Sequence, residues 1–168
     1  KYLIKNVNSG LYLEAADGTV ANGTNVQQGN TESNDIWEVK SAGGGYYYIY
    51  HYGDDSQKTH LLDVDYGKPD NGTNIGLWTD TSSDAQLYKF FDNGDGTYSI
   101  LTKASGDESC LGVTGASKDN GANIVEWACN DSSHQKWVLE IKVLPFDGSL
   151  FKQVMVKDTE NYLDYKTT

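Results

Sequence analysis

The sequence predicts an all-β protein built from three copies of one unit of about 49 residues. Asn-Gly turn signals begin at residues 22, 71 and 120, so both steps between them are 49 residues long. A fixed period of this size indicates a repeat architecture. The 168 residues include 12 Tyr and 18 Gly but only 2 Pro, and none of them form the 3.6-residue pattern of a long amphipathic helix. Tyr, Thr, Val and Ile interleaved with Gly, Asn and Asp favour short strands joined by turns.

Each repeat is expected to contain four short strands separated by turn signals. The repeats cover about residues 1–42, 43–92 and 93–142, which together form one predicted domain. The strands are expected at residues 2–6, 11–15, 25–28 and 35–39, then at 48–50, 61–64, 74–78 and 86–90, and finally at 98–101, 110–113, 123–127 and 135–139. Gly-rich segments between the repeats, at 43–45 and 93–96, are typical of tight turns.

A large aromatic ring closes each unit, at Trp37, Tyr88 and Trp137. Rings at equivalent places in three repeats meet near one axis if the repeats close into a barrel. These three side chains are therefore predicted to fill the interior of a closed barrel.

Residues 143–168 match none of the repeats. Pro145–Ser149 has the composition of a linker, and Leu150–Val156 is expected to be extended. This segment is interpreted either as the first strand of a following module or as a strand packed on the outside of the barrel. Because residue 1 is Lys, the chain is expected to be a piece of a longer protein.

The charge of the chain argues against anionic partners. The formal net charge is −11 and the sequence pI is about 4.5, so nucleic acids and anionic lipid surfaces are repelled. No apolar run reaches the 18 residues of a membrane span. Neither a nucleic-acid nor a membrane partner is expected, and the acidic surface suits neutral ligands.

Motifs for catalysis or metal binding are missing from the sequence. It contains no metalloprotease, nucleophile-elbow or phosphate-loop pattern, and its 3 His have no metal-ligand spacing to the cysteines. Asp92–Gly96 has some features of a calcium loop, but Gly stands at two alternating ligand positions, so a hairpin turn is favoured. No catalytic residue, metal or cofactor is expected.

Two cysteines, Cys110 and Cys129, flank the Asn-Gly turn of the third repeat. A disulfide between them would close one hairpin, contribute about 3 kcal/mol in the chain-entropy model and indicate an oxidising compartment. The alternative is a pair of unbonded buried thiols.

Each unit ends in a variant of the motif Gln-x-Trp. The third repeat has Gln135–Trp137, the second has Gln86–Tyr88, and the first has Asp35–Trp37. With this motif, the period and the cysteine spacing, residues 1–142 resemble the ricin-type β-trefoil lectins and the carbohydrate-binding modules of family 13. The resemblance implies a pseudo-threefold β-trefoil, a Cys110–Cys129 disulfide and a secreted protein.

The same resemblance implies up to one shallow sugar pocket in each repeat. A carboxylate on the second strand accepts hydrogen bonds from two sugar hydroxyls, and an aromatic ring fifteen residues later covers the apolar sugar face. A polar side chain before the Gln-x-Trp motif adds a further bond.

The second repeat keeps the main pair, Asp63 and Trp78, together with Gln86. Its polar position is occupied by Ala85, and Tyr66 is a candidate substitute, as are two nearby aspartates, Asp65 and Asp80. The alternative interpretations are a turn carboxylate for Asp63 and packing on the barrel wall for Trp78.

The other two repeats each lack one member of the pair. The first keeps Glu14, Gln27 and Asn34 but has Gly29 in place of the ring, and the third keeps Trp127 and His134 but has Gly112 in place of the carboxylate. Packing remains the alternative for Trp127, and a solvated loop residue remains the alternative for His134. The second repeat ranks first as a binding site, the first repeat second and the third repeat last.

The expected function is that of a non-catalytic carbohydrate-binding module. It would target an attached polysaccharide-degrading enzyme to a plant cell-wall glycan that contains galactose or a pentose, and several weak pockets would raise the apparent affinity. The alternative is a β-trefoil that serves as a protein-interaction or structural spacer domain, because fold alone does not determine function.

Overall fold

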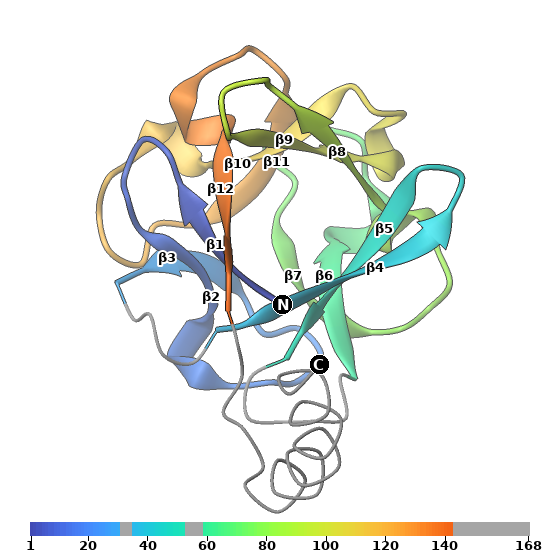
Figure 1. Ribbon diagram of the computed structural model, residues 1–168. Coiled ribbons are helices and arrows are strands. Elements are labelled where there is room, and N and C mark those ends of the chain that lie inside the picture. Colours follow the sequence, from blue (N-terminus) through green and yellow to red (C-terminus); the bar gives the residue numbers. More distant parts are fainter. Residues whose placement is uncertain (31–34, 53–58, 143–168) are drawn as a thin grey trace, which may run out of the picture.

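The computed structural model describes residues 1–30, 35–52 and 59–142, which form an all-β fold (Figure 1). The predicted segment 143–168 and Asn34 lie outside the described residues. The strands are β1 (Tyr2–Asn6), β2 (Tyr12–Ala15), β3 (Val26–Gly29), β4 (Trp37–Gly43), β5 (Tyr46–His51), β6 (His60–Val64), β7 (Ile75–Thr79), β8 (Tyr88–Asp92), β9 (Tyr98–Thr102), β10 (Ser109–Val113), β11 (Ile124–Ala128) and β12 (Trp137–Ile141). Short 3-10 turns are η1 (Ala16–Gly18), η2 (Asp65–Gly67), η3 (Asp84–Gln86), η4 (Lys103–Ser105), η5 (Thr114–Ala116) and η6 (Ser133–Gln135).

No helix in the described part of the chain is long and apolar enough to span a membrane.

The first and fourth strands of the three repeats close into a barrel. β1 pairs with β4, β4 with β5, β5 with β8, β8 with β9, β9 with β12, and β12 returns to β1, all antiparallel. The second and third strands form the hairpins β2–β3, β6–β7 and β10–β11, each attached to the first strand of its own repeat. The predicted β-trefoil of three four-stranded repeats is confirmed.

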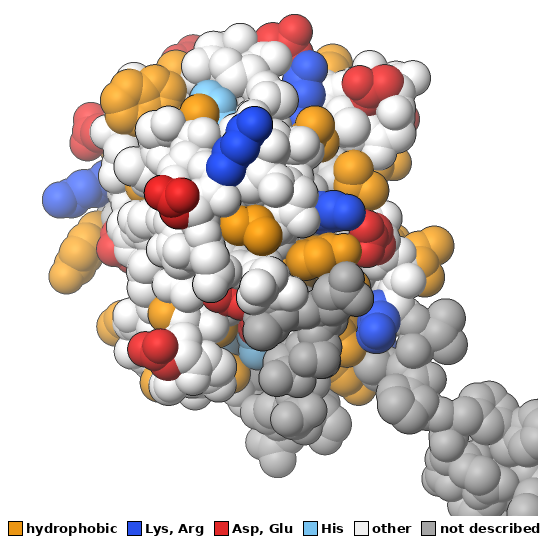
Figure 2. All heavy atoms as spheres, turned by 90° about the vertical axis from the view of Figure 1, so that its left-hand side faces the viewer, with side chains coloured by type: hydrophobic (Ala, Val, Ile, Leu, Met, Phe, Trp, Pro, Cys, Tyr) orange, Lys and Arg blue, Asp and Glu red, His pale blue; other side chains and the backbone are white. Residues whose placement is uncertain are grey.

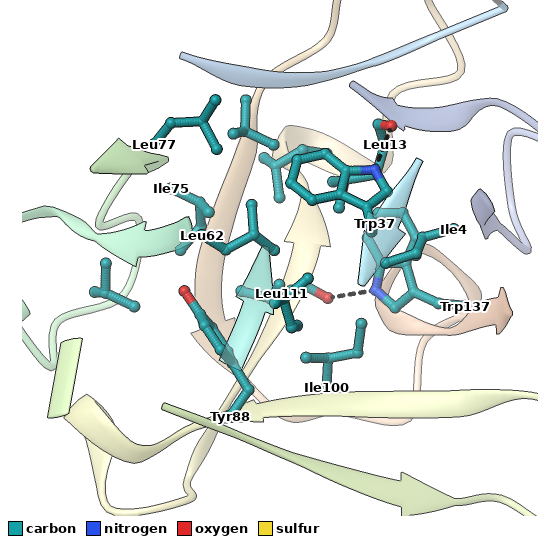
Figure 3. Packing of buried hydrophobic residues seen from close by; sticks show 14 of the residues in the cluster. Ile4, Leu13, Trp37, Leu62, Ile75, Leu77, Tyr88, Ile100, Leu111 and Trp137 are labelled. Carbon is teal, nitrogen blue, oxygen red and sulfur yellow. Dashed lines mark hydrogen bonds between the residues drawn. The ribbon is translucent and has the colours of Figure 1, made fainter. Parts of the chain in front are cut away.

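The barrel is filled by the three closing rings. Trp37, Tyr88 and Trp137 are each 0% exposed and lie among aliphatic side chains (Figure 3). The indole N–H groups donate to the backbone carbonyls of Leu13 at 3.1 Å and Leu111 at 3.0 Å. The Tyr88 hydroxyl is buried and has no hydrogen-bond partner among the described residues. The predicted core is confirmed, and its one non-indole ring leaves a polar group unpaired within the described part of the chain.

The fourth strands begin later than the sequence pattern indicated. Strands were expected from residues 86 and 135, but Gln86 and Gln135 lie in η3 and η6, and the strands start at the rings. The reason is that each amide side chain holds the preceding loop. The Gln86 Oε1 atom accepts from the Thr81 N–H at 2.9 Å, and its Nε2 atom donates to the Thr79 carbonyl at 2.8 Å. Gln135 makes the matching bonds in the third repeat.

Three asparagines spaced by 49 residues form a closed ring of hydrogen bonds between the repeats. Asn74 Nδ2 donates to Asn25 Oδ1 at 2.8 Å, Asn123 Nδ2 donates to Asn74 Oδ1 at 2.7 Å, and Asn25 Nδ2 donates to Asn123 Oδ1 at 2.8 Å. Each amide therefore donates once and accepts once within the ring. This asparagine ring fixes the three repeats relative to one another around the pseudo-threefold axis.

The Asn-Gly turns connect each repeat to the next one. The glycine N–H of each turn donates to a strand carbonyl of the following repeat: Gly23 to Leu77 at 2.9 Å, Gly72 to Glu126 at 2.8 Å, and Gly121 to Gln28 at 2.7 Å. The φ angles of these glycines are 86, 87 and 86°, a left-handed conformation that other residues adopt only with strain. The connections run from the first repeat to the second, to the third and back to the first.

Replacing Asn74 with alanine is expected to lower the free energy of unfolding by about 2 kcal/mol in a urea titration. The substitution leaves Asn25 Oδ1 without its donor and Asn123 Nδ2 without its acceptor, and each lost hydrogen bond between these partly buried amides contributes about 1 kcal/mol. Replacing all three asparagines together should cost less than the sum of the three single replacements, because no partner is then left unpaired. Additive costs would show that the ring does not act as a unit.

Candidate functional site

The second repeat carries a surface hollow of about 680 Å³. Its lining includes Asp63 from β6 and Trp78 from β7. In the β6–β7 hairpin, Asp63 is paired with Gly76, and Trp78 lies two residues beyond Gly76. Since residues two apart in a strand share a face, this register places the carboxylate and the indole on the same side of the hairpin. The fifteen-residue spacing of the sequence thus has a direct structural cause.

Gln86 supports the Asp63 carboxylate by a hydrogen bond from the interior of the protein. Gln86 is fully buried, and its Nε2 atom donates to Asp63 Oδ2 at 2.9 Å. Burial raises the pKa of Asp63 above its ordinary value, the Gln86 bond opposes this, and the charge of Asp65 adds to it. Gln86 therefore orients the acid, whereas Asp63 itself lines the hollow.

Trp78 is supported by the turn of the preceding repeat. Its side chain is 44% exposed, and a Cβ atom at Gly23 would lie 3.9 Å from the indole ring. Gly23 is also part of the lining. The hollow of the second repeat is thus completed by a turn that belongs to the first.

Further aspartates border this hollow. Asp65 and Asp84 line it, and Asp84 forms an ion pair with Lys103 at 3.3 Å. Asp80 does not line it, and its carboxylate accepts from the Ser82 N–H at 2.8 Å and stabilises a turn. Sequence comparison with the family pattern missed Asp84, although its position just before Ala85 and Gln86 was an available signal.

Tyr66 stands at the edge of the same hollow in an unusual backbone conformation. It is 92% exposed and has a φ angle of 57°. The equivalent residues Asp17 and Gly115 have φ angles of 56 and 62°. Asp and Gly tolerate this left-handed region, whereas a bulky residue occupies it at a cost of about 1–2 kcal/mol. The tyrosine therefore occupies a position where local backbone preference disfavours it.

The third repeat has a smaller hollow of about 460 Å³ lined by Trp127, His134 and Gly112. Trp127 is 48% exposed, and a Cβ atom at Gly72 would lie 3.7 Å from its ring, so the turn of the second repeat supports it. Within the described part of the chain, no acidic side chain lines this hollow. A Cβ atom at Gly112 would lie 2.9 Å from Gln135 Cγ, so there is little room for a carboxylate. The structure brings the ring and the histidine together without an acid.

In the first repeat the acid occupies the place of the ring. Gln27 Nε2 donates to Glu14 Oε1 at 2.9 Å. A side chain at Gly29 would overlap the Glu14 carboxyl group. The longer side chain of Glu14 thus lies over the strand position at which the other repeats carry Trp78 and Trp127.

Cys110 and Cys129 form a disulfide with a Cα–Cα distance of 5.1 Å. This predicted bond is confirmed. It joins β10 to the residue that follows β11, and β11 carries Trp127. The bond therefore fixes the hairpin of the third hollow. Among the described residues, no group of three or more His, Cys, Asp or Glu side chains is placed to hold a metal ion.

A model of the ricin-type β-trefoil lectin-like domains matches this chain at residues 1–78, 54–125 and 84–167. The chain belongs to the ricin-type β-trefoil lectin-like family. No curated protein matches the sequence. The fold of this family is in general that of a non-catalytic sugar-binding domain, and the described hollows are consistent with carbohydrate binding.

Solved structures agree with this family assignment. A designed threefold-symmetric protein, ThreeFoil, is 26% identical with a TM-score of 0.77, covering 84% of this chain and 98% of its own. An exo-β-1,3-galactanase from Clostridium thermocellum is 28% identical with a TM-score of 0.77, covering 84% of this chain but only 30% of its own. The Macrolepiota procera ricin B-like lectin in complex with lactose is 16% identical with a TM-score of 0.68, and the match covers 84% of this chain and 94% of the lectin. At this identity the similarity supports the fold alone.

Proposed function

We propose that this ricin-type β-trefoil is a non-catalytic carbohydrate-binding module whose main site is the hollow of the second repeat. The observation that carries the proposal is the placement of the Asp63 carboxylate and the Trp78 indole in one hollow. A sugar has an apolar face of C–H groups and a rim of hydroxyls. The indole covers the face, and Asp63 accepts hydrogen bonds from two hydroxyls at the rim.

The other two repeats contribute less in this proposal. Trp127 and His134 offer a stacking surface and a ring nitrogen, but the hollow has no carboxylate from the described residues to accept charge-assisted hydrogen bonds from a sugar. Glu14 and Gln27 form the described part of the candidate site of the first repeat, which has Gly29 in place of a ring, and Asn34, also predicted for this site, lies outside the described residues. Weak sites on one chain raise the apparent affinity for a polymer that reaches several of them.

The proposed ligand is a neutral polysaccharide. Asp63, Asp65 and Asp84 all line the hollow, and the net charge of the chain is −11. These charges repel the carboxylates of uronic acid polymers. Figure 2 shows one face of the molecule, on which acidic and basic side chains are interspersed. Because three aspartates gather in the hollow, we expect it to account for most of the discrimination between neutral and acidic polysaccharides.

The proposed context is a secreted enzyme of polysaccharide degradation. The similar galactanase is an enzyme of which this chain covers only 30%, which supports a module joined to other modules in one chain. The disulfide supports an oxidising compartment. A plant cell-wall glycan that contains galactose or a pentose is the proposed target.

Replacing Trp78 with alanine is expected to abolish retardation in native gels that contain the preferred neutral polymer. The gels would contain β-1,3-galactan, xylan or polygalacturonan, and the wild-type protein should be retarded by a neutral polymer and not by the acidic one. Loss of the indole removes the surface that covers the sugar, at a cost of about tenfold or more in affinity.

Trp127→Ala is the matched control, because Trp127 is a similarly exposed indole in a hollow without a carboxylate from the described residues. It should reduce retardation much less than Trp78→Ala. Equal losses from both substitutions would argue against the second repeat as the main site. If no glycan retards the wild-type protein, the spacer function is supported instead.

A further inference from the structure

Resting on the proposed sugar site, we propose that Tyr66 forms a second stacking surface, so that the hollow of the second repeat binds two adjoining units of a neutral oligosaccharide. Asp63 and Trp78 hold the first unit, and the Tyr66 ring covers the next. The proposed site thereby extends from one sugar unit of the neutral polysaccharide to at least two adjoining units.

The first line of argument is the exposure of Tyr66 at the edge of the hollow. The side chain is 92% exposed, so its ring contributes almost nothing to the packing of the fold. The Lys68 Nζ atom lies over the Tyr66 ring, 5.5 Å from the ring centroid. The ring nevertheless borders the hollow that contains Trp78. An aromatic face that packs so little against the fold, beside a stacking site, is suited to a ligand.

The second argument is the backbone. Tyr66 has a φ angle of 57°, in the left-handed region that the equivalent Asp17 and Gly115 also occupy. Those two residue types adopt the conformation at low cost, whereas a tyrosine is strained there. Local stability therefore disfavours a tyrosine at this position. Strained positions of this kind cluster at ligand sites.

The third argument is the supply of hydrogen-bond acceptors. One sugar unit uses the Asp63 carboxylate, yet Asp65 and Asp84 line the same hollow. Asp65 follows Asp63 by two residues and directly precedes Tyr66, and its Oδ1 atom lies 3.6 Å from where a Cβ atom of Gly76 would be. In this proposal Asp65, which lines the hollow and adjoins Tyr66 in the chain, is the acceptor for the hydroxyls of the second unit.

The test is isothermal titration of Tyr66→Gly, which takes its residue from the third repeat, and of Tyr66→Phe. The probes are galactose, β-1,3-galactobiose, xylose and xylobiose. The wild-type protein should bind one disaccharide about tenfold more tightly than its monosaccharide. Tyr66→Gly should lose this advantage and keep the monosaccharide affinity, whereas Tyr66→Phe should keep both. Because Gly relieves the backbone strain, the melting temperature of Tyr66→Gly should not fall, so that lost affinity cannot be ascribed to unfolding.

Each other outcome overturns the inference. If the wild-type protein binds the monosaccharide and the disaccharide equally well, the second surface does not exist, although the proposed sugar site stands. If Tyr66→Gly weakens both probes alike, Tyr66 belongs to the first unit's site. If the wild-type protein binds none of the probes while it is folded, the proposed function fails and this inference fails with it.

Discussion

Replacing Asp63 with asparagine is expected to reduce the affinity for the preferred neutral glycan about 100-fold, while the melting temperature stays unchanged or rises slightly. An amide oxygen accepts more weakly than a carboxylate, and the amide N–H₂ group cannot accept the second sugar hydroxyl. The fold should tolerate the change because the new amide oxygen can still accept from Gln86. Calorimetric titration and thermal unfolding measure the two quantities.

The pKa of Asp63 supports the stability part of this expectation. Burial raises the pKa of Asp63, so the folded protein favours the protonated acid more than the unfolded chain does. The ionised form therefore costs stability at pH values above the raised pKa, and no cost remains once the acid is protonated in both states. Asparagine removes the cost at neutral pH. For the same reason, sugar binding should weaken on acidification at a higher pH than an ordinary aspartate would show.

Asp80→Asn is the matched control. Asp80 lies in the same repeat, but its carboxylate stabilises the turn at Ser82 and does not line the hollow. It should leave glycan binding unchanged. Wild-type affinity in Asp63→Asn, or an equal loss in Asp80→Asn, would show that Asp63 is not the acceptor.

Glu126→Gln is expected to raise the free energy of unfolding by about 2 kcal/mol at pH 8 and to leave it unchanged at pH 4. Glu126 is fully buried in β11, where the Thr102 hydroxyl donates to its Oε1 atom at 3.1 Å and its Oε2 atom has no partner among the described residues. Burial is the main reason that its pKa rises to about 7.

The direction of the pH dependence follows from this raised pKa. Below pH 4.5, the ordinary value for glutamate, the acid is protonated in the folded and the unfolded protein, so no cost arises. As the pH rises from there to about 7, the unfolded chain ionises first and the folded protein loses stability. Above that pH the loss is complete. Glutamine avoids it entirely, which is why the gain appears only at the higher pH.

The first repeat shows that an amide fits at this position. Gln28, two repeat lengths before Glu126, is also fully buried, and its Nε2 atom donates to the carbonyls of Ser117 at 3.0 Å and Asp119 at 2.9 Å. Gln28→Glu should therefore create a second loss of stability between acidic and neutral pH. Urea titrations at pH 4, 6 and 8 measure both variants. A gain in Glu126→Gln that is equal at all three pH values would refute protonation as its cause.

The repeat pattern was sufficient to predict the fold because the spacing of turns and rings is a property of the chain itself. This trefoil is built from units of nearly equal length that each end in one large ring, and Trp37, Tyr88 and Trp137 supplied that signal directly. Strand ends were less predictable. A glutamine is compatible with a strand or with a loop, so Gln86 did not mark the start of the strand. The structure shows that the Gln86 side chain accepts a hydrogen bond from the preceding loop and that β8 begins at Tyr88.

The candidate site was predicted less completely, for two physical reasons. Asp63 and Trp78 were found because a hairpin register fixes their spacing. Asp84 was missed because it reaches the hollow from a different element, η3, whose position depends on tertiary packing. The sequence likewise did not predict that the Glu14 carboxyl group lies over Gly29, where the other repeats carry a tryptophan. This arrangement depends on the conformation of one flexible side chain.

The glycine turns have a consequence for any attempt to divide this molecule. A Cβ atom at Gly23 would contact Trp78, and one at Gly72 would contact Trp127, so each of these two hollows is assembled from two neighbouring units. A peptide that contained only the second unit would include Asp63 and Trp78 but would lack the closed barrel and the Gly23 turn that packs against Trp78. Such a fragment would gain affinity for sugar only by associating with two others as a homotrimer, and its binding would then depend on its own concentration.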